Sequence, residues 1–223
     1  TFAMGSNGFD VDGNVILDGT ITATAAELQC SGSLTKKVTT CQTLPSGLTI
    51  TMDGTGTLTC NAVSGGMLVN NTAGTITVGD AQLWDSWTNT LGTYTGGAYA
   101  HTIVGNIVRT AGTCSTTGVW TQTGTGNLGW NAPTDGQYPA SLVVNGTGTF
   151  TASFYCKAFS GSGTIADSGA FSIRLTTSTD NFWGYTGSSC AVHVIINTTT
   201  SGISTGEAVT LQGKNFTVVR SSG

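Results

Sequence analysis

The sequence predicts an all-β protein, an antiparallel β-sandwich or jelly roll with an extended N-terminal strand. Threonine, glycine and serine supply 96 of the 223 residues, whereas only 18 residues are charged. Threonine is favoured on pleated sheets and glycine in turns, so this composition favours many short strands over helices. Short alternating segments separated by turn pairs also recur along the chain. More than a dozen such strands are typical of a sandwich or jelly roll.

The first element is the stretch 9–24, in which every odd position is apolar or glycine and every even position except Ile16 is polar. This is the period of a half-buried β-strand. Sixteen residues would extend over about 50 Å, whereas a typical strand has about 5 or 6 residues. The stretch therefore either breaks at its glycines or reaches beyond its own domain. We predict an N-terminal arm at 1–29, a candidate donor strand, and a β-sandwich domain at 30–223.

The elements after the arm follow from local patterns. Residues 24–27 have the form of a capping box, which predicts a helical turn before Cys30. Strands are then predicted at 48–52, 55–63, 67–70, 75–78, 101–108, 119–123, 142–145, 147–159, 170–176, 191–197, 208–211 and 215–219. Turn pairs such as Asp53-Gly54, Gly96-Gly97 and Asn145-Gly146 separate them, as expected of hairpins.

Two similar segments within the chain, here called the echo, leave open a division into two domains. Residues 48–59 and 142–151 both consist of an alternating segment, a glycine turn and a second segment with Gly-Thr-Gly-Thr, and each is soon followed by a cysteine. Two duplicated sandwiches, split near residue 112, would explain the echo. A chain this rich in threonine and glycine also produces such a match by chance, so a single sandwich is preferred.

Charge and motifs exclude several classes of function. The net charge is −4 and the seven basic residues are scattered, which argues against a nucleic-acid partner. No apolar run approaches the length of about 20 residues that a membrane span needs. His101 and His193 are the only histidines, and no pair of carboxylates stands out, so we predict no enzyme, no metal site and no cofactor.

The cysteines form an even set without a C-x-x-C pair: Cys30, Cys41, Cys60, Cys114, Cys156 and Cys190. Metal sites usually have closely spaced ligands, so disulfides in an oxidising compartment are preferred over free buried thiols. Six cysteines allow 15 pairings. Among these we predict Cys30 with Cys41, Cys60 with Cys114, and Cys156 with Cys190. An extracellular or cell-surface location follows from the disulfides, and the start at Thr1 is consistent with removal of a signal peptide.

Two further groups of residues are candidates for surface roles. Sequons begin at Asn70, Asn145, Asn197 and Asn215, which are candidate N-glycosylation sites. Aromatic residues gather in segments rich in glycine, asparagine and threonine, where they could stack on a glycan, form a subunit contact or fill a core. The candidates for glycan or interface contact are Trp84, Trp87, Trp120, Trp130, Trp183 and Tyr185.

Two short segments resemble known families. Residues 22–28, Thr-Ala-Thr-Ala-Ala-Glu-Leu, resemble a short sequence segment of phage tail-fibre and virion-surface proteins. Residues 15–22, leading on to Cys30, are similar to the start of chaperone–usher pilins, and the layout is similar to archaeal thread-like filament subunits. The chain departs from pilins in the late position of Cys30 and in lacking a penultimate tyrosine.

In those filament families an N-terminal strand completes the sandwich of the neighbouring subunit. The resemblance and the long alternation together imply subunit contacts by Phe9, Val11, Val15, Leu17, Gly19 and Ile21. The expected function is a structural subunit of an extracellular filament or surface coat, a homopolymer that assembles through its N-terminal strand. A secreted carbohydrate-binding module with glycans as ligands, and a viral fibre or capsid-surface protein, are the alternatives.

Overall fold

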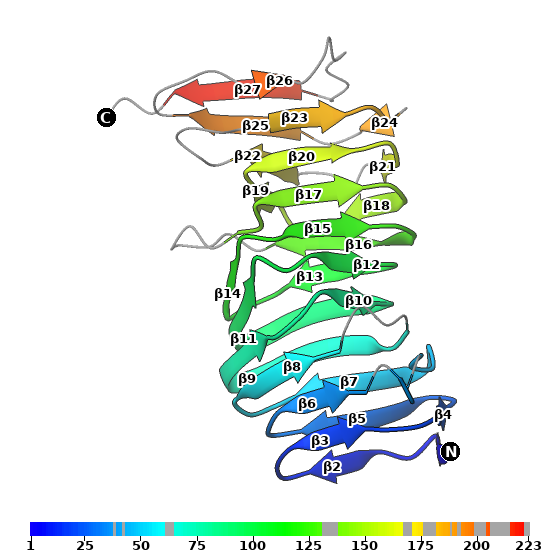
Figure 1. Cartoon of the computed structure of the whole chain (residues 1–223). Helices are drawn as coiled ribbons and strands as arrows, with labels where there is room; N and C mark the ends of the chain where they lie inside the picture. Colours follow the sequence, from blue (N-terminus) through cyan, green and yellow to red (C-terminus); the bar gives the residue numbers. More distant parts are fainter. Residues whose placement is uncertain are drawn as a thin grey trace.

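The chain coils around a single axis, and each turn lays its strands on those of the turn before (Figure 1). The computed structural model describes residues 1–37, 39–41, 43–60, 65–130, 138–166, 171–175, 182–187, 189–190, 193–198, 204–205 and 215–220. Within them every strand pairing is parallel, and the result is a β-solenoid of about 8 turns. The expected antiparallel sandwich or jelly roll is therefore wrong.

Three long sheets form the sides of the coil. One contains β10 (Gln82–Trp84), β12 (His101–Ile103), β15 (Val119–Gln122), β17 (Ser141–Val144), β20 (Ala158–Gly161), β23 (Phe182–Tyr185) and β26 (Ser204–Thr205). The largest contains β2 (Phe9–Val11), β5 (Ala26–Cys30), β7 (Leu48–Met52), β9 (Met67–Val78), β11 (Ser86–Gly97), β13 (Ile107–Arg109), β16 (Thr125–Trp130), β18 (Thr147–Phe150), β21 (Thr164–Ala166) and β24 (Ser189–Cys190). The third contains β19 (Phe154–Cys156), β22 (Ser172–Leu175), β25 (His193–Thr198) and β27 (Asn215–Arg220).

Shorter groups complete the coil. At the N-terminal end, β1 (Phe2–Gly5) pairs with β4 (Ile21–Ala23). The largest sheet has further strands beside those given above: β3 (Val15–Leu17) pairs with β6 (Leu34–Lys36), and β6 pairs with β8 (Gly56–Thr59). The ladder continues from β8 to the second half of β9, then to β11 and β14 (Thr113–Thr116).

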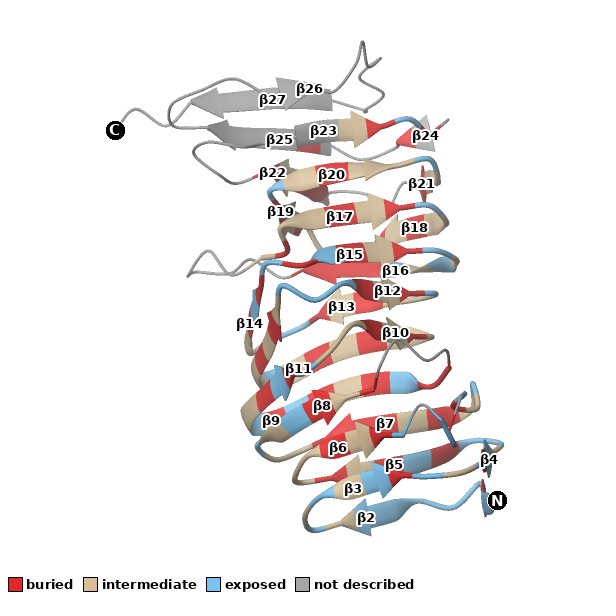
Figure 2. Ribbon diagram, viewed as in Figure 1, coloured by how far each residue is buried: buried red, intermediate tan, exposed pale blue. Residues whose placement is uncertain are grey.

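The core is a set of side-chain ladders inside the coil. Parallel register places one residue of each turn above its equivalent in the turn before, and alternate residues point inward. One ladder is apolar and buried throughout: Leu28, Ile50, Leu68, Trp87, Ile107, Leu128 and Phe150. The buried residues in Figure 2 alternate along the strands in the same way.

Two of the turn pairs expected in hairpins, Asp53-Gly54 and Asn145-Gly146, are corners of the coil, whereas Gly96-Gly97 ends strand β11. A Cβ atom at Gly54 would lie 1.7 Å from the carbonyl oxygen of Ser31, in the turn beneath. Successive turns stack so closely at this corner that a side chain does not fit. Both echo segments, 48–59 and 142–151, are likewise strand–corner–strand units of the coil: β7 with β8, and β17 with β18.

The N-terminal stretch also differs from its prediction. It breaks into β2, β3 and β4, with Gly13 and Gly19 at φ angles of 140° and 91° between them. These strands pair with β5, β6 and β1 of the same chain, so the expected donor-strand exchange is wrong. The expected helical turn at 24–27 runs into strand β5, because tertiary pairing overrides a local capping signal.

The cysteines are thiols. All six lie within the described residues, all are buried, and none forms a disulfide, so the expected pairs Cys30–Cys41, Cys60–Cys114 and Cys156–Cys190 are wrong. They occupy positions of small apolar residues inside the coil, a role in which cysteine is common.

Candidate assembly surface at the N-terminal end

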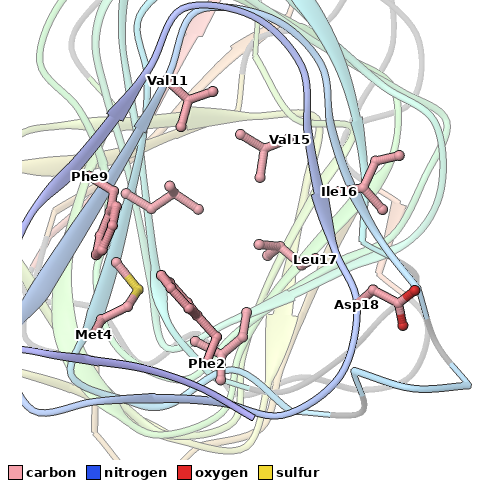
Figure 3. A pocket seen from close by; sticks show the side chains of 10 residues that line it. Phe2, Met4, Phe9, Val11, Val15, Ile16, Leu17 and Asp18 are labelled. Atoms are coloured by element: carbon pink, nitrogen blue, oxygen red, sulfur yellow. The ribbon is translucent and has the colours of Figure 1, made fainter.

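The N-terminal end of the coil is a hollow surrounded by apolar side chains (Figure 3). It encloses about 330 Å³ and is lined by Phe2, Met4, Phe9, Val11, Val15, Ile16, Leu17, Asp18, Ile21 and Leu28. Nine of these ten residues are apolar. Most of the lining comes from the same inward positions that form the core ladders in later turns, such as Phe9 above Leu28, whereas Ile16 and Asp18 point away from the hollow (Figure 3).

Strand edges surround the hollow. Among the described residues, β2 has β5 as its one strand partner, and β3 has β6. Their other edges face away from the coil and offer backbone N–H and C=O groups to a further strand. Figure 1 shows β2 as the outermost labelled strand at this end.

Aromatic rings fill part of the hollow without closing it. Phe2 and Phe9 meet edge to face with ring centroids 5.1 Å apart. Phe2 remains 50% exposed and Phe9 41%, whereas Ile16 is exposed on the outer face of β3. In a solenoid the outer face of a terminal repeat is usually polar, which keeps the protein soluble. This end is apolar instead.

Three carboxylates lie on or beside the strands of this end. Asp10 and Asp12 are exposed on and beside β2. Asp18 forms an ion pair with Lys37 at 2.8 Å and also accepts a hydrogen bond from Thr40. The hydrogen bonds from Lys37 and Thr40 lower the pKa of the Asp18 carboxyl. The end is therefore an apolar surface with two exposed carboxylates at β2 and one ion pair.

The residues predicted to contact another subunit gather here. Phe9, Val11, Val15, Leu17 and Ile21 line the hollow, whereas Gly19 is at a corner between β3 and β4. Sequence reasoning missed Phe2, Met4 and Leu28, because Phe2 and Met4 precede the alternating stretch 9–24 and Leu28 follows it. The register of Phe9 with Leu28 is the relation that brings them together.

The tryptophans expected at a glycan or subunit interface are inside the coil. Trp84, Trp87, Trp120 and Trp130 are each at most 1% exposed. An aromatic ring with no exposed face cannot stack on a sugar, so these four rings are not available to a glycan in the folded coil. Tyr185 is also buried, and its hydroxyl donates to the carbonyl of Gly163 at 2.7 Å. Trp183 lies in β23, and its side chain is outside the described residues.

The sequons fall in different environments. Asn70 is fully buried and its amide donates to Asn89 Oδ1 at 2.6 Å, so it is not a glycosylation site in the folded protein. Asn145 is exposed at a corner. Asn197 and Asn215 lie in β25 and β27, and their side chains are outside the described residues.

Several polar groups inside the coil have structural partners. Lys36 donates to the carbonyl of Cys41, and burial lowers the pKa of its amine. Asp80 accepts from the Cys60 backbone at 3.0 Å and from the Gln82 amide at 2.6 Å. No group of three or more metal-ligating side chains occurs in the part of the chain that the structure describes. His193 lies in β25, and its side chain is among those not described.

The described residues form a parallel β-solenoid whose first turn lines an apolar hollow. Comparisons with protein-family models, with curated proteins and with solved structures find no match. Among the described residues, no helix has the length and apolar character needed to cross a membrane.

Proposed function

We propose that the protein is a structural subunit of a filament or surface coat, and that it assembles through its N-terminal end. The proposal is based on the hollow lined by residues between 2 and 28. At this end of the coil, apolar side chains of the core remain exposed. The expected homopolymer is retained, but the contact is end-to-end stacking of coils and not the donation of a strand.

The energetics favour stacking over exposure. Complete burial of a side chain the size of phenylalanine or isoleucine contributes about 1.5 to 3 kcal/mol. Phe2 and Phe9, which are 50% and 41% exposed, together offer about half to the whole of one such contribution. Backbone hydrogen bonds along the edges of β2 and β3 would add about 0.5 to 1.5 kcal/mol each. These gains offset the loss of translational and rotational freedom on association.

The two alternative functions are affected differently. The carbohydrate-binding function is less well supported, because four of the tryptophans proposed to stack on a glycan are buried. A viral fibre or capsid-surface protein needs the same stiff rod and the same end contact, so it remains a version of this proposal. The extracellular location is proposed without the disulfides that first suggested it, and thiols buried in a core can persist in either redox environment.

Sedimentation velocity over a wide range of protein concentration tests the proposal. The unmodified chain should form larger species as concentration rises. Phe9→Lys should abolish them, because a charge in the hollow cannot be buried unpaired. Leu91→Lys is the matched control, since Leu91 is 48% exposed on β11 in the body of the coil. A chain that stays monomeric at every concentration, or equal loss of assembly in both variants, would contradict the proposal.

A further inference from the structure

We infer that the partner of the N-terminal end is the C-terminal end of a second copy, so that the subunits stack head to tail. This inference rests on the proposed function and adds the identity and polarity of the contact. A head-to-tail contact joins two different surfaces, and it therefore leaves one free end of each kind and can propagate into a filament.

Strand direction favours this arrangement. All pairings among the described strands are parallel, and β26 and β27 are the last strands of their sheets at the C-terminal end. If a second copy continues the coil with the same polarity, its first strands add to these edges in the same parallel pattern. Two N-terminal ends facing each other would instead meet with antiparallel strands, a pairing found nowhere in the described coil.

The apolar register also continues to the last strand. In β27, Phe216 is in register with Val194, which is in register with Ile173 of β22. Val194 and Ile173 are fully buried. Val218 occupies the position that follows Ile196 and the buried Leu175. The last strand therefore places apolar residue types at the ladder positions that a following turn would cover, as the hollow does at the other end.

Charge separates the two ends. The N-terminal end exposes Asp10 and Asp12, whereas the third carboxylate, Asp18, is paired with Lys37. The last strand, β27, contains Arg220 and no acidic residue. Two N-terminal ends brought together would place like charges side by side, whereas a head-to-tail junction brings Asp10 and Asp12 toward the end that bears Arg220. Like-charge contacts of this kind disfavour the wrong partner.

Two variants, each with one end of the coil blocked, test whether the subunits stack head to tail. Phe9→Lys blocks the N-terminal end, and Phe216→Lys blocks the C-terminal end. Circular dichroism establishes that each variant retains its β-structure, and Arg220→Glu is a milder C-terminal block if Phe216→Lys loses it. Sedimentation velocity is then measured for each variant alone and for an equimolar mixture, with Leu91→Lys as the control that still polymerises.

The outcomes distinguish the arrangements. Head-to-tail stacking predicts that each blocked variant alone is monomeric, and that the mixture forms dimers and nothing larger, because only one intact junction is available. If the C-terminally blocked variant dimerises alone and the mixture adds nothing, the contact is head to head; the polarity is then wrong and the proposed function stands. If the unmodified chain itself remains monomeric, another occupant covers the hollow, and both the inference and the proposed function fail.

Discussion

His101 lies flat against Trp120, with ring centroids 4.2 Å apart and planes only 3° from parallel. The imidazole Nδ1 is 2.9 Å from the carbonyl oxygen of Tyr99, which can only accept a hydrogen bond, so Nδ1 carries the proton. Nε2 then accepts from the Tyr94 hydroxyl at 3.0 Å. The neutral ring is fully satisfied in a buried position, and burial lowers the pKa of His101 to about 4.

This lowered pKa predicts a loss of stability in mild acid. Between pH 6.5 and about 4 the unfolded chain binds a proton at His101 that the folded protein does not bind, so the free energy of unfolding falls as pH falls. The expected loss across this window is on the order of 3 kcal/mol. Urea unfolding at a series of pH values measures it. His101→Gln should be less stable at pH 7 and show a flatter dependence between pH 4 and 6.5; an unchanged slope would show that other groups are responsible.

Trp87 connects the aromatic core. Its ring lies 4.6 Å from Trp120, 5.6 Å from Trp130 and 5.2 Å from Tyr94, centroid to centroid. Trp87→Ala should reduce the free energy of unfolding by about 3 to 5 kcal/mol, because it leaves a cavity among rings that cannot collapse together. Trp87→Phe should retain much of the packing and cost clearly less. Equal losses in the two variants would argue against a packing role for the larger ring.

Individual strands were predictable from sequence because alternation is a local property. The segments 142–145 and 191–197, for example, overlap β17 and β25. Parallel pairing was not predicted, since a short strand followed by a glycine turn looks the same in a hairpin and in a coil. The available signal was the period: Leu68, Trp87 and Ile107 are 19 and 20 residues apart and stack directly. A repeat of that length is the signature of a solenoid.

The candidate site was predictable in part for the same reason. Alternation placed Phe9, Val15 and Leu17 on one apolar face, and they line the hollow. The sequence could not show that Phe2 meets Phe9, because that contact depends on where the chain turns. The buried tryptophans were ambiguous because glycine, asparagine and threonine are as common at the corners of this coil as in binding loops.

Gly146 is predicted to be intolerant of any side chain. A Cβ atom there would lie 1.9 Å from the carbonyl oxygen of Gly124 in the turn beneath, which is backbone and cannot move aside without separating the turns. Gly146→Ala should therefore lower the midpoint of urea unfolding strongly. Gly8→Ala is the control, because its nearest contact would be the Glu27 carbonyl oxygen at an ordinary 3.7 Å. Similar midpoints for the two variants would mean that the corner is less tightly stacked than described.

The cysteines should be unreactive thiols in the native protein. Burial raises the pKa of Cys156 to about 12 and raises those of Cys60 and Cys114 as well, so little thiolate forms near neutral pH. Intact mass under non-reducing conditions should equal that of the chain with six thiols. Iodoacetamide should modify them slowly in buffer and rapidly in denaturant. A mass lower by one or more pairs of hydrogens would reveal disulfides instead.

Asn89 is the centre of a buried polar ladder. Its Oδ1 accepts from the Asn70 amide at 2.6 Å, and its own amide donates to the Ala111 carbonyl at 2.8 Å. Asn89→Ala removes both partners, and each buried group left unpaired should cost about 1 to 3 kcal/mol in the free energy of unfolding.

The combination of Asn70→Leu with Asn89→Leu should cost less than the two single changes added together. Each single change leaves a buried amide opposite a group that cannot bond to it, whereas the double change removes both members of the pair and replaces them with apolar volume. A double-mutant cycle by urea unfolding measures the coupling, which is expected in the range of about 0.5 to 3 kcal/mol for residues in contact. Additive losses would show that the two amides contribute independently and that the ladder is not a cooperative unit.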